Sequence, residues 1–348
     1  MAAVQKYFDL FHDKIKLGRF DEEDTLRDKR RIVREKLLAN LPGVFEKYEE
    51  KNLVPTFRDQ GSYAMNTGIK PLDGDFDIDQ GAYFETSVTD YPDPVVLKER
   101  VHEALDGHTK KVEIRRPCVT VFYQNGYHVD LAVYSCAAAN TDKQDYLAMG
   151  KVGSEEKYRV WQLSDPTALT DKLFERFDGD DTGRKQYRRI IRFMKRWKDV
   201  NFASGGNGAP RGIGLTVNTH DYFQPNYDAT SYKLDDLTAL RDLAQAMLDA
   251  FSSTWVFAEW KFVRRLKAQL LVTPFNDVYE KITSKQMETF ETKLQELCDA
   301  LNAAIKEVDT RKACQLLHNV FGSDFDVPEE SATARSTPAP VSTHSQSA

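Results

Sequence analysis

The stretch Gln60-Gly61-Ser62, followed after a short spacer by Asp75-Phe76-Asp77-Ile78-Asp79, decides how this chain folds. In the second segment carboxylates alternate with apolar residues, which is the pattern of a β-strand with one polar face. Tyr127-His128-Val129-Asp130-Leu131-Ala132-Val133-Tyr134 repeats this pattern. An acid within an apolar strand is costly unless a cation or hydrogen-bond donors satisfy it. The segments therefore predict strands that present carboxylates to a cation.

The spacing of the acids is suited to binding two cations. Residues two apart share a strand face, so Asp77 and Asp79 would lie roughly 6.6 Å apart along one side. Such a pair can hold two ions about 3.5–4 Å apart, and Asp130 would complete the site. Mg²⁺ prefers oxygen ligands, with Mn²⁺ as the alternative. Asp75 has the same parity, so the spacing leaves open which two of the three acids bind; after Asp73-Gly74 it is also interpreted as a strand-entry residue.

The Gly-Ser turn ahead of these acids predicts a triphosphate site. Gly61 lets the backbone approach a phosphate closely, and the Ser62 hydroxyl and nearby amides, with Gln60 beside them, can donate to it. A lone Asp-x-Asp is more often a solvated strand face or a turn. In combination, the turn and the two acidic strands predict metal-dependent nucleotidyl transfer.

These motifs resemble those of the polymerase-beta-like nucleotidyltransferases. Within that superfamily, Phe76-Asp77-Ile78-Asp79-Gln80-Gly81 is similar to the Asp-x-Asp-Asp-Gly segment of bacterial cyclic-oligonucleotide synthases of the cyclic GMP-AMP synthase/DncV-like (CD-NTase) family. The resemblance places the metal pair at Asp77 and Asp79, with Asp130 as the third acid. Gln80 departs from the pattern, because many relatives have an acid there.

The resemblance extends to about residue 322. Residues 188–198 predict a basic amphipathic helix similar to the Lys-x-Trp-Lys helix of the family, in which a lysine reaches the donor triphosphate. The resemblance makes Lys195 the first candidate and Lys198 the second; the alternative is a solvated basic face. The segment from Pro210 to Thr216 resembles the start of the family's next helix, but Arg211 or Gly212 replaces its serine. Arg211 could bind phosphate through its charge.

The family resemblance implies an activity. Ribonucleoside triphosphates, ATP with GTP or a pyrimidine nucleotide, would be condensed into a cyclic di- or trinucleotide second messenger with release of pyrophosphate. It also implies a role in bacterial antiphage (CBASS-type) signalling, with a downstream effector that reads the product. A linear oligonucleotide synthase or an RNA-modifying nucleotidyltransferase is the alternative, and a non-catalytic nucleotide-binding module is a third.

Composition narrows the classes of partner. The chain has 348 residues, 41% of them apolar, and a net charge of −6, which argues against a broad surface for duplex nucleic acid. The cysteines have no paired metal-ligand spacing and predict reduced thiols; they are Cys118, Cys136, Cys298 and Cys314. No signal-peptide pattern is present, and no apolar run approaches the roughly 20 residues that cross a bilayer, so we expect a cytoplasmic protein with no membrane partner.

The pattern along the chain predicts an α+β fold with two lobes and a nucleotide cleft between them. The expected parts are bracing helices in 1–51, a nucleotidyltransferase core in 52–160, a helical lobe in 161–325 and a disordered tail in 326–348. Within the core, the pair Asn125-Gly126 favours a type I′ hairpin that returns Asp130 antiparallel to residues 119–123. The aromatic residues of 254–272 are expected in a core.

Four further positions carry weaker hypotheses. Tail sequences of this kind can be joined through a small C-terminal residue to a target by a partner ligase, and Ala348 fits that role by resemblance. His128 shares the face of Asp130 and is expected to orient a neighbour. We expect Tyr83 to pack in the core rather than stack on a base, and Lys70 to be a solvated loop residue.

Overall fold

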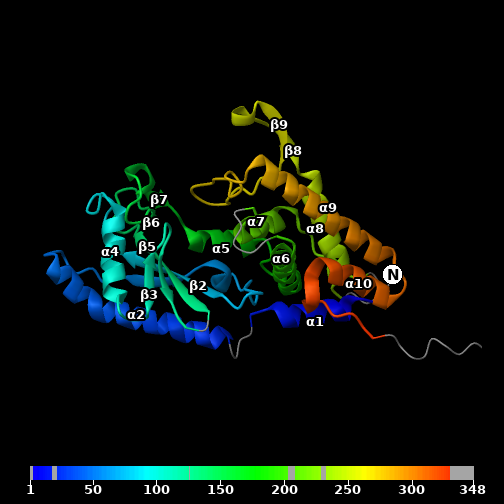
Figure 1. Ribbon diagram of the computed structural model, residues 1–348, viewed down its shortest axis with the longest axis horizontal. Coiled ribbons are helices and arrows are strands. Elements are labelled where there is room, and N and C mark those ends of the chain that lie inside the picture. The colour runs from blue at the N-terminus through cyan, green and yellow to red at the C-terminus, as the bar shows by residue number, and fades with distance from the viewer. Residues whose placement is uncertain (1–2, 18–21, 125, 203–207, 229–232, 330–348) are drawn as a thin grey trace, which may run out of the picture.

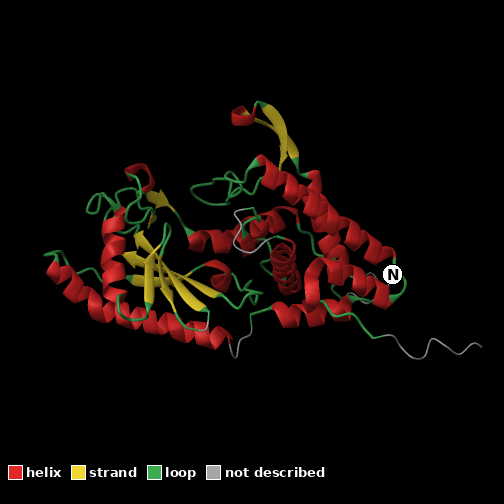
Figure 2. Cartoon of the chain, viewed as in Figure 1, coloured by secondary structure: helices red, strands yellow, loops and turns green. Residues whose placement is uncertain are grey.

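The structure is a computed structural model that describes residues 3–17, 22–124, 126–202, 208–228 and 233–329. Its strands gather in one lobe, while the other lobe is built almost entirely of helices (Figures 1 and 2). Within the described ranges, no helix is both long enough and apolar enough to cross a membrane. The predicted α+β class with two lobes is confirmed.

A mixed sheet forms the core of the first lobe. Its strands are β1 (Thr56–Asp59), β2 (Phe76–Phe84), β3 (Lys111–Ile114), β4 (Val119–Phe122), β5 (Tyr127–Ser135), β6 (Tyr146–Ala148) and β7 (Trp161–Leu163). The order is β1-β2-β5-β4-β3, and β6 joins β5 to β7. Among the strand pairs that the described residues form in this sheet, only β2–β5 is parallel. The two acidic strands are therefore direct neighbours at the centre of the sheet.

Helices surround the sheet and build the second lobe. They are α1 (Gln5–Ile15), α2 (Glu22–Lys47), α3 (Gly61–Ala64), α4 (Pro94–Leu105), α5 (Pro166–Glu175), α6 (Asp181–Asn201), α7 (Gly212–Tyr222), α8 (Asp236–Asp249), α9 (Ser284–Lys306) and α10 (Thr310–Phe321). Short 3-10 turns are η1 (Glu156–Tyr158), η2 (Phe257–Glu259) and η3 (Gly322–Asp324). Aspartates accept from backbone amides at the starts of α4, α5, α6, α8 and α10, which satisfies donors that a helix end leaves free.

The N-terminal segment divides between two hydrophobic cores. We expected residues 1–51 to brace the sheet together. In the structure α2 packs on the sheet with α4, through residues such as Leu37 and Phe45. By contrast, α1 buries Phe8 and Phe11 in the core of the helical lobe, against Phe193 of α6 and Phe321 of α10. The chain therefore crosses from one lobe to the other before the sheet begins.

The hairpin that carries Asp130 pairs β4 with β5 in antiparallel register, as predicted. Tyr123 N donates to Tyr127 O at 2.7 Å, at the end of the ladder. The type I′ turn predicted at Asn125-Gly126 includes Asn125, which lies outside the described residues. Gly126 has φ +74°, and a Cβ there would lie 2.3 Å from Gly74 O. The close approach of the 73–75 turn explains why glycine is needed at this position.

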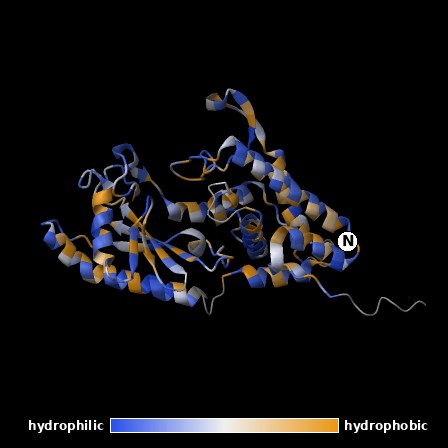
Figure 3. Cartoon of the chain, viewed as in Figure 1, coloured by the Kyte–Doolittle hydropathy of each residue, from blue (hydrophilic) through white to orange (hydrophobic). Residues whose placement is uncertain are grey.

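The aromatic segment of the second lobe is exposed, which corrects the expectation of a core. Its strands β8 (Ser252–Val256) and β9 (Lys261–Arg265) form a hairpin that stands out from the lobe (Figure 1). Phe257, Trp260 and Phe262 are each more than two thirds exposed. Figure 3 shows hydrophobic residues at this tip as well as in the sheet. Their ring contacts are local to the hairpin, because an isolated two-stranded ribbon has no facing layer to bury them.

The beginning of the predicted tail is ordered. Lys14 pairs with Asp326 at 2.5 Å, and Arg311 Nε donates to Pro328 O at 3.1 Å, so residues 326–329 lie against α1 and α10. Residues 330–348, including Ala348, lie outside the described residues. The predictions of disorder and of ligation at Ala348 therefore stay untested.

Candidate active site

Two neighbouring strands bring the three predicted acids to one face of the sheet. In the parallel register of β2 and β5, Asp77 lies opposite His128 and Asp79 lies opposite Asp130. Because side chains two apart point to the same side, all four project from one face. A ligand atom from each of Asp77, His128 and Asp130 lies within 4.8 Å of the others. The sheet therefore assembles a compact acidic cluster from residues about fifty positions apart in the sequence.

Two neighbours hold these side chains in place. Thr120 lies opposite Asp130 on β4, and its hydroxyl donates to Asp130 Oδ1 at 2.5 Å. This bond leaves the other carboxylate oxygen for a ligand. His128 Nδ1 lies 3.1 Å from Asp75 Oδ1, and its Nε2 lies 3.5 Å from Asp77 Oδ1. The prediction that His128 orients a neighbour is consistent with these contacts.

The charges in the cluster repel one another, which fits a site for a cation. Partial removal from water, followed by the charges of Asp79 and Asp130, raises the pKa of Asp77 well above its usual value. Removal from water and the charge of Asp130 likewise raise the pKa of Asp79. A bound divalent ion would offset both effects. Carboxylate oxygens are suitable ligands for Mg²⁺ or Mn²⁺, so the residues present fit the metal that the motif implies.

Gly61 lies directly beside the acidic cluster. It begins α3 with φ +63°, and a Cβ added there would lie 1.9 Å from Asp79 Oδ2. Only glycine can therefore occupy this position next to the carboxylate. Ser62 follows in the same turn, with its hydroxyl 3.8 Å from the Cβ position of Gly68. The predicted triphosphate turn is thus adjacent to the predicted metal pair.

Side chains of helix α6 donate hydrogen bonds to the loop that connects the Gly-Ser turn to β2. The contacts are Arg192 Nη2 to Asn66 O at 2.6 Å, Arg192 Nε to Gly68 O at 3.2 Å, Lys195 Nζ to Thr67 O at 3.0 Å and Thr67 Oγ1 at 3.2 Å, and Arg196 Nη2 to Lys70 O at 2.6 Å. The basic face of α6 is therefore not simply solvated. It joins the helical lobe to the sheet lobe next to the acids.

Lys195 has the environment expected of a phosphate contact. Burial, with Arg192 and Lys198 adding positive charge, lowers the pKa of Lys195 to about 7. Asp79 is near enough to favour its charged form. The Cβ position of Gly212, at the start of α7, lies 3.8 Å from Lys195 Cε. The segment that resembles the serine-containing family motif therefore adjoins this lysine, although this chain has no serine hydroxyl there.

The structure gives less support to two of the predicted nucleotide-binding residues. Lys198 Nζ pairs with Asp199 at 2.9 Å, which engages its charge within the same helix. Arg211 is exposed just before α7. Both stay predictions, and the geometry favours Lys195 over either of them.

The side chain of Gln60, on the face of the sheet that carries the acids, has a structural role. The Gln60 side chain donates to Tyr83 OH at 3.0 Å and accepts from Tyr134 OH at 3.4 Å, in the space that Gly81 leaves. Its amide is thus engaged, although its backbone lies beside Asp79. Tyr83 stacks on Tyr134 with ring centroids 4.4 Å apart, as expected for packing.

The structure explains why glutamine can replace the acid of the family pattern at position 80. Its side chain is fully buried and points away from the acids, because it alternates with Asp79 along β2. Arg34 Nε donates to Gln80 Oε1 at 2.8 Å, and Asp59 lies beside both side chains. An acid at this position would not face the predicted metals.

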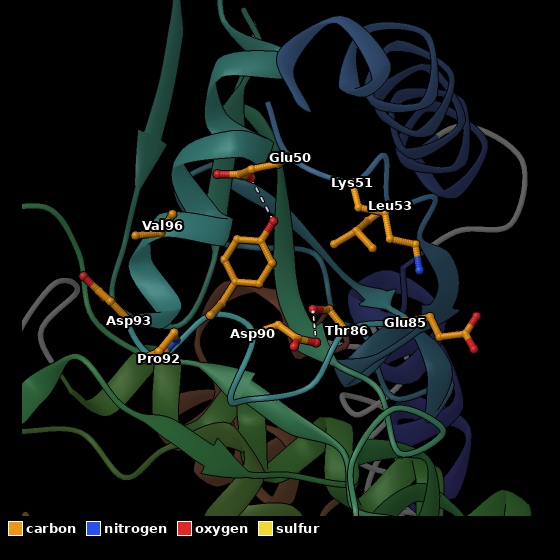
Figure 4. A pocket seen from close by; sticks show the side chains of 10 residues that line it. Glu50, Lys51, Leu53, Glu85, Thr86, Asp90, Pro92, Asp93 and Val96 are labelled. Carbon is orange, nitrogen blue, oxygen red and sulfur yellow. Dashed lines mark hydrogen bonds between the residues drawn. The ribbon is translucent and has the colours of Figure 1, made fainter. Parts of the chain in front are cut away.

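A separate pocket of about 710 Å³ lies near the start of α4 (Figure 4). It is lined in part by Glu50, Tyr91 and Asp93, and none of the predicted site residues lines it. Tyr91 OH donates to Glu50 Oε2 at 2.8 Å, and Glu50 also pairs with Arg100. Asp93 pairs with Arg159. These acids are thus satisfied within the protein.

Some site residues escaped the sequence reasoning. Thr67 and Thr120 were not predicted, since a lone threonine has no motif. The signal for Thr120 was available, because the pairing of the hairpin fixes which residue lies opposite Asp130. The sequence places Arg192 only on a basic helix face, because its hydrogen bonds to the 66–70 loop depend on a contact between the lobes.

A mixed sheet presents three carboxylates on its parallel pair beside a Gly-Ser turn, and a helix with a half-buried lysine faces them. This arrangement is that of a nucleotidyltransferase. Comparison with known proteins agrees. Residues 55–134 match the family described as "Cyclic GMP-AMP synthase DncV-like, nucleotidyltransferase domain". Residues 55–134 are therefore similar to a DncV-like nucleotidyltransferase domain.

Similar proteins extend the likeness beyond that domain. A cyclic AMP-AMP-AMP synthase of Acinetobacter sp. (strain ATCC 27244 / 9458) is 25% identical over 275 residues, which cover 76% of this chain and 71% of that protein. The fold resembles crystal structures of the Vibrio cholerae DncV cyclic AMP-GMP synthase. The complex with nonhydrolyzable GTP has a TM-score of 0.69 at 18% identity, covering 92% of this chain and 96% of the other. The complex with the linear intermediate 5′ pppA(3′,5′)pG has a TM-score of 0.66 at 19% identity, with the same coverage.

Proposed function

We propose that this nucleotidyltransferase condenses ribonucleoside triphosphates into a cyclic di- or trinucleotide and releases pyrophosphate. The observation that carries the proposal is the parallel register of β2 and β5, which sets Asp79 opposite Asp130 and beside Gly61. The curated relative is a cyclic AMP-AMP-AMP synthase, and the similar DncV structures are complexes with nonhydrolyzable GTP and with a linear dinucleotide intermediate. The activities of these similar proteins support a cyclic product.

The side chains of this chain divide the work. Asp77, Asp79 and Asp130 would hold Mg²⁺ or Mn²⁺, while Ser62 and Lys195 would bind the donor triphosphate. When bound, two such ions supply charge neutralisation at the triphosphate and activation of the attacking hydroxyl. Thr120 keeps Asp130 Oδ1 in place, so that the carboxylate has a defined orientation toward the acceptor ribose.

The bond changes are those of an in-line displacement. The ribose hydroxyl oxygen of the acceptor gives up its proton to solvent beside Asp130, attacks the α-phosphorus, and forms a new phosphodiester bond. The bond from the α-phosphorus to the bridging oxygen breaks, and pyrophosphate leaves with that oxygen. The same bond changes repeat for each further bond, and in the last displacement a ribose hydroxyl of the linear product attacks its own α-phosphorus, releases a further pyrophosphate and closes the ring. The charge of Lys195 would stabilise the negative charge that builds up on the leaving group.

The test is a product assay. Purified protein would be incubated with the four ribonucleoside triphosphates and Mg²⁺ or Mn²⁺, and products that resist phosphatase would be identified by mass spectrometry. We expect a cyclic product that an Asp77→Ala/Asp79→Ala variant does not form. Exclusively linear products would favour the alternative, a linear oligonucleotide or RNA-modifying enzyme. Binding of nucleotide without any product under these conditions would favour the non-catalytic module.

The cellular role is part of the same proposal. The resemblance to cyclic-oligonucleotide synthases supports antiphage signalling in the bacterial cytoplasm, with an effector that reads the product and a ligase that acts on the tail. Phage plating on cells that express the complete system tests this role. The Asp77→Ala/Asp79→Ala variant and deletion of Ala348 should each abolish protection, the first through synthesis and the second through the tail.

A further inference from the structure

We infer that His128 is a nitrogen ligand of the cation held by Asp77 and Asp130, with Asp75 as the positioning residue that orients its ring. The inference rests on the proposed metal-dependent function and adds to it. The predicted motif contains oxygen ligands only, whereas the structure places an imidazole among them.

The position of His128 follows from two strand registers. It lies opposite Asp77 on β2 and two residues before Asp130 on β5, so it shares their face of the sheet. Its side chain is 9% exposed, while that of Asp77 is 48% exposed. Phe122 packs beside the ring at 5.8 Å between centroids. The imidazole is therefore held from behind and has the acids in front of it.

The hydrogen bond to Asp75 determines which ring nitrogen is free. An ionised carboxylate can only accept, so His128 Nδ1, at 3.1 Å from Asp75 Oδ1, carries the hydrogen. In neutral imidazole the lone pair is then on Nε2, which faces Asp77. A histidine that binds a metal commonly donates its other nitrogen to a carboxylate in this way.

The distance to Asp77 favours a shared ion over a direct hydrogen bond. His128 Nε2 and Asp77 Oδ1 are 3.5 Å apart. Good N–H···O bonds span about 2.7–3.2 Å. Two ligands that each lie about 2.1 Å from one ion are separated by roughly 3–4.2 Å. The competing interpretation is an imidazolium that pairs with both Asp75 and Asp77, and it predicts no bond from nitrogen to a metal.

A nitrogen ligand changes which ion the site prefers. Mg²⁺ prefers oxygen ligands and retains water. Mn²⁺ also binds mainly oxygen, but as the first member of the transition-metal series it binds imidazole more strongly than Mg²⁺ does. We therefore expect the protein without nucleotide to bind Mn²⁺ more tightly than Mg²⁺. His128 should account for a substantial part of this difference.

The experiment uses the full chain and Mn²⁺ alone, without nucleotide, so that no base nitrogen contributes. Electron spin-echo envelope modulation would detect ¹⁴N coupled to Mn²⁺, and titrations would give the affinities for Mn²⁺ and Mg²⁺. His128→Phe keeps an aromatic ring beside Phe122 and removes the nitrogen. It should abolish the imidazole coupling and weaken Mn²⁺ binding about 10–100-fold, with a smaller effect on Mg²⁺.

Two further variants separate ligation from folding. Asp75→Ala should weaken Mn²⁺ binding while the ¹⁴N coupling persists at saturating metal, because the ligand is still present. His220→Phe is the matched control, since His220 pairs with Asp221 at 2.9 Å on α7, away from the acidic cluster. It should leave both the coupling and the affinities unchanged.

The spectrum of the wild-type protein decides the inference even if a variant misfolds. Bound Mn²⁺ without ¹⁴N coupling, or no binding of Mn²⁺ alone, would overturn it. A cyclic product made with Mg²⁺ would in either case leave the proposed function intact. Conversely, ¹⁴N coupling in a protein that makes no nucleotide product would support the metal site and contradict the synthase.

Discussion

The acidic face of β2 and β5 differs from the basic face of α6 in how its like charges are compensated. On the sheet, Asp77 and Asp79 lie close together, and their raised pKa values show that the protein alone does not compensate them. On the helix, Arg192 and Arg196 donate to backbone carbonyls of residues 66–70. One face is therefore suited to a cation from solution, whereas the charges of the other are engaged by the neighbouring loop. Lys195 is intermediate, because its present partner is Thr67 and its proposed partner is a triphosphate.

The largest expected effect concerns the acidic face of β2 and β5. Asp77→Ala should reduce the rate of product formation by about 10³-fold or more, because a lost metal ligand removes several kcal/mol of transition-state stabilisation. It should not destabilise the metal-free protein, since one repelling charge is gone. Product formation by mass spectrometry and thermal unfolding would be measured together. Lower stability with normal activity would reverse the comparison.

The next effect concerns a buried cation of the basic face, Arg196. Arg196 is 2% exposed, donates to Lys70 O and pairs with Asp324 at 3.1 Å. Arg196→Met should lower the free energy of unfolding by about 3 kcal/mol, because breaking a buried pair leaves polar partners unsatisfied. Urea unfolding measures it. Arg211→Met, at an exposed position, is the control and should change stability by less than about 0.5 kcal/mol.

Lys195 should affect activity more than stability. We expect Lys195→Met to lower kcat/KM about 10–100-fold, because one charged hydrogen bond to the triphosphate is lost. Lys198→Met is the control, and its effect should be smaller since Lys198 pairs with Asp199. Initial rates over a range of ATP concentrations measure both. Equal losses in the two variants would contradict the preference for Lys195.

A smaller effect should appear in the pH dependence of stability. A folded-state carboxyl with a raised pKa keeps its proton where the unfolded chain has already lost one, so stability falls as the pH rises above the ordinary carboxyl pKa of about 3.9. The fall should continue until the raised pKa values of Asp77 and Asp79 are passed. Urea unfolding in EDTA at several pH values would show it. In Asp77→Asn the slope should be shallower, and an unchanged slope would refute this account.

The smallest effect is expected on the opposite face of the sheet. Gln80→Glu restores the acid common in relatives, but the side chain meets Arg34 and Asp59 instead of the metal site. Activity should stay within about twofold, and stability should fall by at most about 1 kcal/mol. Rates and urea unfolding would be compared with wild type. A tenfold change in rate would mean that Gln80 acts on the site.

Much of the site could be predicted because it depends on short-range rules. The period of two along a strand puts Asp77 and Asp79 on one face and turns Gln80 to the other. The alternation around Asp130 works in the same way. The role of Gln60 was harder to foresee, because its side chain fills the space beside Gly81 between two tyrosines.

Sequence by itself determined the strands, their polar faces and the basic helix, since each is a local pattern of polar and apolar residues. Only the tertiary structure decided what these faces meet. It placed β2 parallel to β5, so that Asp77 lies opposite His128. It also determined that α1 and α2 pack in different hydrophobic cores. It also left the aromatic tip of the β8–β9 hairpin in solvent. Periodicity specifies which side chains share a face, whereas pairing between distant segments determines the partner of that face.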